Sequence, residues 1–167
     1  EVAAELGIRG THTITVSVRD LESSDEFMTQ GWSGKKVATD GKYVRYALGD
    51  ADKPGGSGAL VDFAVEPDLP PASWTFGEGI VHHTAFQVDD LAAQDAVKDH
   101  LVALGFTDTS DRKDRGYFDS VYVRTPGGAM FEATVSKSTG FLIDETYELL
   151  GKGFQVPPVF ASRREEI

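Results

Sequence analysis

Residues Gly58–Val65 read GALVDFAV, and residues Gly128–Val135 read GAMFEATV. Both segments begin with Gly-Ala, end with Val and carry a carboxylate at the fifth position, Asp62 in the first and Glu132 in the second. Short apolar segments rich in Val and Phe are typical of strands. Because the two segments lie at an offset of 70 residues, they indicate an internal repeat.

A second pair of segments has the same offset. Residues 18–21 (VRDL) match residues 88–91 (VDDL). Each follows a predicted strand, at 12–18 and 81–88, and begins a predicted helix, at 21–29 and 91–104. Further strands are predicted at 42–48, 59–65, 117–124 and 129–135. The pattern favours an α+β fold of two βαβββ modules with curved mixed sheets.

The expected organisation follows from this repeat. We predict a first module at residues 1–66, a Pro-rich crossover at 67–78, a second module at 79–136 and a C-terminal tail at 137–167. The tail has a helical piece near 144–150 and is expected to wrap the outside. The chain does not begin with Met. We therefore interpret it as the C-terminal half of a longer protein.

Composition excludes several classes of function. The 167 residues carry 16 Lys and Arg against 27 Asp and Glu, a net charge of −11, which argues against nucleic acid or an anionic membrane as partner. Cys is absent, which excludes disulfides, thiolate metal sites and a cysteine nucleophile. Neither a membrane-spanning apolar run nor a signal peptide pattern is visible, so we expect a cytoplasmic protein.

A candidate metal site emerges from the strand periodicity. His83, Ala85 and Gln87 share one face of the strand at 81–88, whereas His82 belongs to the other face. Glu132 lies between apolar neighbours, and a buried carboxylate needs a partner, of which a cation is the strongest. His83 and Glu132 suggest two ligands of a 2-His-1-carboxylate site for non-haem Fe(II). The alternative is a core histidine and a surface glutamate.

The third ligand is not evident from the spacing. His12 is a candidate, but the offset aligns His12 with His82 and aligns Thr13 with His83, so His12 has the wrong parity. The alternative for His12 is a strand-opening residue with local hydrogen bonds. Thr13 and Asp62 then form a vestigial counterpart of the site.

Two further side chains could carry chemistry. Arg115 could hold an anionic substrate oxygen, and Tyr122 could donate a hydrogen bond or stack on a ring. The alternative is a surface arginine and a packing tyrosine.

The βαβββ repeat resembles the vicinal-oxygen-chelate superfamily, which comprises glyoxalase I, bleomycin-resistance proteins and extradiol dioxygenases. More narrowly, three segments and the tail resemble hydroquinone-type ring-cleaving dioxygenases. The segments are GIVHHTAF (79–86), DRGYFDSVYVRTPGG (114–128) and FEAT (131–134).

The resemblance implies site residues and chemistry. His83 and Glu132 are expected to bind Fe(II), with Mn(II) also possible, and the third ligand is expected from a His in an N-terminal half absent here. His82, Arg115 and Tyr122 are expected to line the pocket as catalytic residues, with His82 moving a proton. The implied reaction is extradiol-type cleavage of a hydroquinone- or catechol-like substrate by O2.

Two rival functions stay open. One is a glyoxalase-like metal isomerase or lyase, and the other is a metal-free module that binds a small ligand, as bleomycin-resistance proteins do. We also expect a homo-oligomer, such as a dimer, or association with an N-terminal half.

Overall fold

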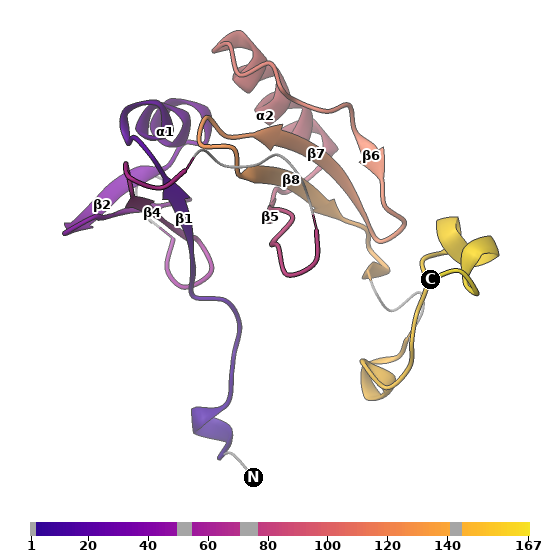
Figure 1. The fold of residues 1–167 in the computed structure, drawn as a ribbon. Coiled ribbons are helices and arrows are strands. Elements are labelled where there is room, and N and C mark those ends of the chain that lie inside the picture. Colours follow the sequence, from indigo (N-terminus) through magenta and orange to yellow (C-terminus); the bar gives the residue numbers. More distant parts are fainter. Residues whose placement is uncertain (1–2, 50–54, 71–76, 141–144) are drawn as a thin grey trace. The chain divides into compact units, whose positions relative to one another are not determined.

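The computed structural model describes residues 3–49, 55–70, 77–140 and 145–167 (Figure 1). The chain divides into two compact units, one formed by residues 1–75 with 125–129 and the other by 76–124 with 130–167. Each unit contains one four-stranded sheet.

The sheet of the first unit has the order β1-β4-β3-β2, in which β1 runs parallel to β4 and the other neighbours are antiparallel. Helix α1 (Glu22–Glu26) continues as a π-helical turn, η2 (Phe27–Gly31). A short 3-10 turn, η1 (Ala4–Leu6), precedes the sheet. The strands are β1 (Thr13–Val18), β2 (Lys35–Asp40), β3 (Tyr43–Ala47) and β4 (Leu60–Val65).

The second unit repeats this plan with the order β5-β8-β7-β6 and a parallel β5–β8 pair. Helix α2 (Leu91–Ala103) begins after Asp90, whose side chain accepts a hydrogen bond of 2.8 Å from the Ala93 amide. Its strands are β5 (Thr84–Gln87), β6 (Lys113–Asp114), β7 (Phe118–Arg124) and β8 (Met130–Ser136). The tail contains the 3-10 turns η4 (Tyr147–Leu149) and η5 (Pro158–Arg163).

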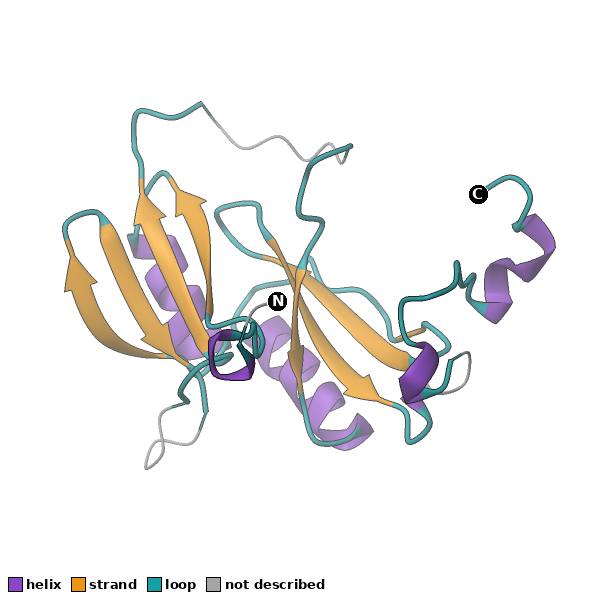
Figure 2. Ribbon diagram, turned by 90° about the horizontal axis from the view of Figure 1, so that it is seen from below, coloured by secondary structure: helices purple, strands orange, loops and turns teal. Residues whose placement is uncertain are grey.

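One face of each sheet packs against a helix (Figure 2). In the first unit, Phe27 and Met28 of the π-helical turn are buried, as are Tyr46 and Phe63 of the sheet. In the second unit, the fully buried Gln94 of α2 donates hydrogen bonds of 2.8 Å to the carbonyls of Asp119 and Ala133. These contacts leave the opposite face of each sheet for polar residues. The buried apolar residues of the second unit include Leu101, Val121, Val123, Phe131 and Ala133.

The predicted α+β fold with two βαβββ modules is confirmed, and the repeat extends to the hydrogen-bond register. Ile14 pairs with Val61 in the first sheet, and Thr84 pairs with Phe131 in the second. Both residues of the second pair lie 70 positions after those of the first. The same offset that relates the sequences therefore relates the two parallel strand pairs.

The structure corrects several element boundaries. The strand predicted at 81–88 begins only at Thr84, so His82 and His83 precede it and the predicted opposite faces do not apply to them. The edge strands β2 and β6 were not predicted, because β2 is exposed throughout and β6 has only two residues. Of the helical piece near 144–150, Asp144 lies outside the described residues, and η4 forms at Tyr147–Leu149. The predicted module boundaries and the wrapping of the tail stay predictions. Among the described helices, none has the length and apolar character to cross a membrane.

Candidate functional site

Glu132 is the most unusual buried group of the second unit. It lies on β8 between Ala85 of β5 and Tyr122 of β7, and its exposed fraction is 0%. Neither of its carboxylate oxygens accepts a hydrogen bond from the described residues. A buried carboxylate without hydrogen bonds is strongly unfavourable unless a cation or a proton compensates its charge.

The imidazole of His83 lies next to this carboxylate. Its Nε2 lies 2.8 Å from Oε2 of Glu132, within ion-pair distance, but the geometry is not that of a hydrogen bond. The imidazole is about one-third exposed, at 32%, so the pair joins the buried strand to the surface. An imidazole nitrogen and a carboxylate oxygen that converge in this way are donors suited to a divalent transition metal.

His82 contacts the other side of the His83 ring. The two Nδ1 atoms lie 2.8 Å apart, so one ring must donate and the other accept. When Nε2 of His83 serves as a ligand, its proton resides on Nδ1, and His83 is then the donor. His82 must present an unprotonated Nδ1, and it thereby fixes the tautomer and orientation of His83.

Tyr122 and Arg115 extend the site along the sheet. The Tyr122 ring packs edge-on against His83, with ring centroids 5.6 Å apart. Nε of Arg115 donates a hydrogen bond of 3.3 Å to the Tyr122 hydroxyl, and the guanidinium lies 5.4 Å from the centre of the ring. The phenol and the guanidinium thus face the same space as the histidine pair.

A turn holds Arg115 in place. The Asp114 carboxylate accepts a hydrogen bond of 2.7 Å from the Gly116 amide, and the Arg115 amide donates to the Phe118 carbonyl at 2.9 Å. Gly116 has a φ of 84°, which an L side chain rarely adopts. Lys137 lies 2.6 Å from Asp114 and, together with the Gly116 amide, lowers the pKa of that carboxyl, so it stays ionised at neutral pH.

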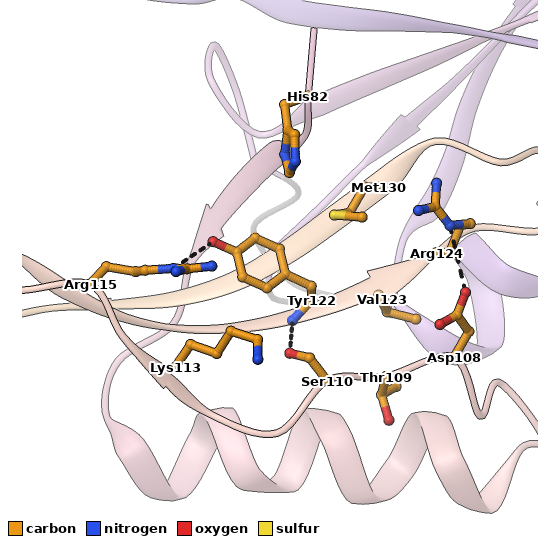
Figure 3. Close-up of a pocket in the computed structure, with 10 residues that line it drawn as sticks. All are labelled: His82, Asp108, Thr109, Ser110, Lys113, Arg115, Tyr122, Val123, Arg124 and Met130. Atoms are coloured by element: carbon orange, nitrogen blue, oxygen red, sulfur yellow. Dashed lines mark hydrogen bonds and ion pairs between the residues drawn. The ribbon is translucent and has the colours of Figure 1, made fainter. Parts of the chain in front are cut away.

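His82, Arg115 and Tyr122 line a pocket of about 290 Å³, whereas His83 and Glu132 are not among its lining residues (Figure 3). All of its residues belong to the second unit. His82, Arg115 and Tyr122 were predicted from the sequence as pocket residues, and the others were not. The alternation of Lys113 and Arg115 beside a predicted strand was a usable signal that both side chains lie on one face. The lining residues are His82, Asp108, Thr109, Ser110, Lys113, Arg115, Tyr122, Val123, Arg124 and Met130.

In the first unit, the equivalent carboxylate, Asp62, has an arginine as its partner. Asp62 accepts two hydrogen bonds from Arg45, at 2.7 and 2.8 Å, and this contact raises the pKa of the guanidinium further. Thr13 does not join Asp62: it donates to the Leu60 carbonyl at 3.1 Å, and Thr15 is the cross-strand neighbour of Asp62. The guanidinium of Arg45 therefore supplies the positive charge beside this carboxylate.

The third ligand is not found within the described parts of the chain. No group of three or more His, Asp or Glu side chains suited to a metal occurs in residues 3–49, 55–70, 77–140 and 145–167. His12 lies in the first unit, where its Nδ1 is 2.8 Å from the Ser57 hydroxyl.

Comparison with known proteins places this geometry in a family. The profile of the Glyoxalase/Bleomycin resistance protein/Dioxygenase superfamily matches residues 10–133. The chain belongs to this superfamily. The match extends from the residues before β1 into β8 and confirms the resemblance noted in the sequence. The superfamily fold accounts for the paired four-stranded sheets.

Individual members of the superfamily are close in sequence. The chain is 44% identical over 166 residues to a chlorohydroquinone/hydroquinone 1,2-dioxygenase of Sphingobium indicum, a match that covers 99% of the chain and 50% of that protein. It is 29% identical over 160 residues to MhqE of Bacillus subtilis, provisionally named a ring-cleaving dioxygenase, covering 96% and 49%. The chain thus spans about half the length of the curated relatives it matches.

Solved structures of the superfamily share the fold. A Bacillus subtilis crystal structure, provisionally described as a dioxygenase, superposes with a TM-score of 0.81 at 25% identity and covers 100% of this chain and 51% of that one. The fosfomycin resistance protein FosX of Listeria monocytogenes superposes with a TM-score of 0.58 at 18% identity, covering 79% and 97%. The second likeness concerns the fold alone.

Proposed function

We propose that this chain supplies the substrate pocket and two metal ligands of a ring-cleaving dioxygenase that acts on hydroquinone- or catechol-like aromatics. The observation that carries the proposal is the buried Glu132 carboxylate, which accepts no hydrogen bond from the described residues and lies 2.8 Å from Nε2 of His83. The similarity to a chlorohydroquinone/hydroquinone dioxygenase supports the choice of substrate class.

The donor set fits a non-haem metal. His83 and Glu132 would hold Fe(II), or Mn(II), as one imidazole and one carboxylate of a 2-His-1-carboxylate site, and a His outside the described residues would complete it. When bound, such a metal lowers the pKa of a coordinated phenol and brings the phenol and O2 together. Within the described parts of the chain, Glu132 has no competing hydrogen bond that would have to break before it binds a cation.

The other pocket residues act on the substrate. Arg115 and Tyr122 present a guanidinium and a hydroxyl that favour negative charge on a ring oxygen. The Tyr122 ring offers an aromatic edge and face against which a substrate ring can pack. His82 positions His83 through its Nδ1 atom and is exposed enough to exchange a proton with a substrate hydroxyl.

A second half completes the protein in this proposal. The curated relatives are about twice as long as this chain, and the tail presents large apolar side chains to solvent. Exposed apolar groups gathered in one segment are typical of surfaces that pack against another part of a protein. We therefore propose association with an N-terminal half. The exposed residues of the tail are Tyr147, Leu149, Leu150, Phe154, Val159, Phe160 and Ile167.

The direct test is oxygen consumption by the full-length protein. The protein is purified without oxygen, loaded with Fe(II) or Mn(II), and mixed with hydroquinone, chlorohydroquinone or catechol in an oxygen electrode. We expect equimolar loss of substrate and O2 and a ring-opened product by mass spectrometry. Glu132→Gln should abolish turnover, whereas Glu66→Gln, a change at a carboxylate that binds Lys42 in the first unit, should not. Unaltered substrate with no O2 uptake would contradict the proposal and favour a small-ligand binding protein.

A further inference from the structure

The pocket in Figure 3 is positively charged although the chain carries a net charge of −11. Of its ten lining residues, Lys113, Arg115 and Arg124 are cations and Asp108 is the carboxylate. In an acidic protein, such a local excess of positive charge raises the concentration of anionic ligands at the site.

Two of the three cations already have protein partners. Arg115 donates to the hydroxyl of Tyr122, and Nε of Arg124 lies 3.6 Å from the Asp108 carboxylate. Arg124 is also largely covered, with its side chain 13% exposed. Both arginines therefore have a protein partner before a ligand binds.

Lys113 differs from both arginines. Among the described residues, no hydrogen bond or ion pair engages its ammonium group. Asp111 is bound at 2.8 Å by Lys98, and that contact, with a smaller effect from the charge of Lys113, lowers the pKa of Asp111. The Lys113 ammonium therefore carries a charge that the pocket does not neutralise.

The position of Lys113 defines one end of the pocket. Lys113 lies on the edge strand β6 and pairs with Ser120 of β7, whereas His82 belongs to the segment before β5 at the other edge of the sheet. In the view of Figure 3, His82 and Lys113 lie on opposite sides of Tyr122, and Met130 adds an apolar surface next to the phenol ring. A ring that binds with one hydroxyl toward the histidine pair points its far side toward the edge strand.

We propose that Lys113 forms an anion subsite, which binds a negatively charged oxygen on the far side of the substrate ring. This inference rests on the proposed function for the orientation of the ring. Two kinds of substituent provide such an oxygen: a ring carboxylate, and a second hydroxyl made acidic by neighbouring halogens. Either would form a charge-assisted hydrogen bond with the ammonium group.

The test compares three ligands in the full-length protein. 2,5-Dihydroxybenzoate carries a carboxylate, chlorohydroquinone carries a hydroxyl that one halogen makes more acidic, and methylhydroquinone carries neither. Dissociation constants are measured calorimetrically in the absence of oxygen, and kcat/KM is measured by oxygen uptake. The variants are Lys113→Met, Lys113→Arg and the control Lys35→Met, which makes the same charge change on the exposed strand β2 of the first unit.

We expect Lys113→Met to weaken binding of 2,5-dihydroxybenzoate about tenfold, the size of one charged hydrogen bond, and to leave methylhydroquinone within about twofold. Lys113→Arg should restore most of the affinity, and Lys35→Met should behave as wild type. A parallel loss for chlorohydroquinone identifies an ionised hydroxyl as a second ligand of the subsite, and its absence restricts the subsite to carboxylates.

Two outcomes would overturn the inference: equal losses for all three ligands, or no loss for 2,5-dihydroxybenzoate, including failure of the wild type to bind it. The binding measurement separates this result from the proposed function. If the anionic ligands bind in a Lys113-dependent manner but no O2 is consumed, the subsite stands and ring cleavage fails.

Discussion

The guanidinium of Arg45 binds the carboxylate of Asp62 through two hydrogen bonds of 2.7 and 2.8 Å. The cross-strand neighbour of the equivalent carboxylate in the second unit, Glu132, is Tyr122, which carries no charge. One repeat of the fold therefore pairs its buried acid with an arginine, whereas in the other repeat the acid lies 2.8 Å from the imidazole of His83.

Arg45→Met should destabilise the first unit. Asp62 is 7% exposed, and its carboxylate would lose both charged hydrogen bonds. Since the Arg45 side chain is partly accessible to water, solvent screens the ion pair. We therefore expect a fall in Tm of only about 3 °C, measured by circular dichroism. Arg45→Met with Asp62→Leu should regain most of this loss, because the unpaired charge is gone. The exposed Arg9→Met serves as control, and an unchanged Tm for Arg45→Met would refute the role of the pair.

Glu132→Gln should separate stability from metal binding. In metal-free protein, the neutral amide removes an uncompensated buried charge, and we expect stability to stay equal or to rise by about 1 kcal/mol. Fe(II) should raise the Tm of the wild type but not that of the variant. Denaturation with and without metal, together with elemental analysis, measures both effects. Wild-type iron content in the variant would rule out Glu132 as a ligand.

His82→Ala should weaken metal retention without removing a ligand. Without the hydrogen bond at Nδ1, His83 is no longer held in one tautomer and one ring orientation. Removing a residue that hydrogen-bonds a metal ligand typically lowers metal affinity by about 10- to 100-fold. Competition with a chelator gives the affinity. His82→Asn, whose side-chain oxygen can accept the same hydrogen bond, should recover part of it. The same affinity in all three proteins would show that His82 has no positioning role.

Asp25 should make stability depend on pH below neutrality. Lys36, at 2.7 Å, and the Tyr46 hydroxyl lower the pKa of this carboxyl below its usual 3.8. A lowered pKa in the folded state adds stability above about pH 4, which is lost as the pH falls through the folded-state pKa. Allowing for solvent screening, Asp25→Asn should cost about 0.5–1 kcal/mol at pH 7 and progressively less as the pH falls below about 4. Urea unfolding across this range, with Asp68→Asn as control, checks the slope, and a pH-independent loss would contradict it.

Much of the fold is predictable from the sequence because the repeat lies in the apolar strands. The segments around Asp62 and Glu132 share composition, length and flanking glycines, so their constant offset is sufficient to indicate two equivalent units. The apolar neighbours of Glu132 also pointed to a partner for this carboxylate, and Nε2 of His83 lies 2.8 Å from it. The strand periodicity used in that prediction does not extend to His83, because β5 begins at Thr84. Edge strands such as β6 were not predictable, since two exposed residues leave no periodic signal.

The constant offset of 70 does not relate the strands next to the two carboxylates, β3 and β7. A shift of 70 aligns Arg45 with Arg115, but in the structure the cross-strand partner of Glu132 is Tyr122, 77 positions after Arg45. The cause is loop length: residues 48–59 separate β3 from β4, whereas only residues 125–129 separate β7 from β8. A sequence comparison at constant offset cannot register this shortening, so it does not predict the Arg45–Asp62 pair.

The contrast between Arg45 and the neighbourhood of Glu132 also bears on how duplicated units diverge. A guanidinium is encoded in the gene, stays charged at every physiological pH and cannot be removed by a chelator. In the proposed function, the charge that compensates Glu132 comes from a bound metal ion, which a chelator can remove. One repeat thus carries its own compensating charge, whereas occupancy of the proposed site in the other repeat depends on the concentration of free metal ion.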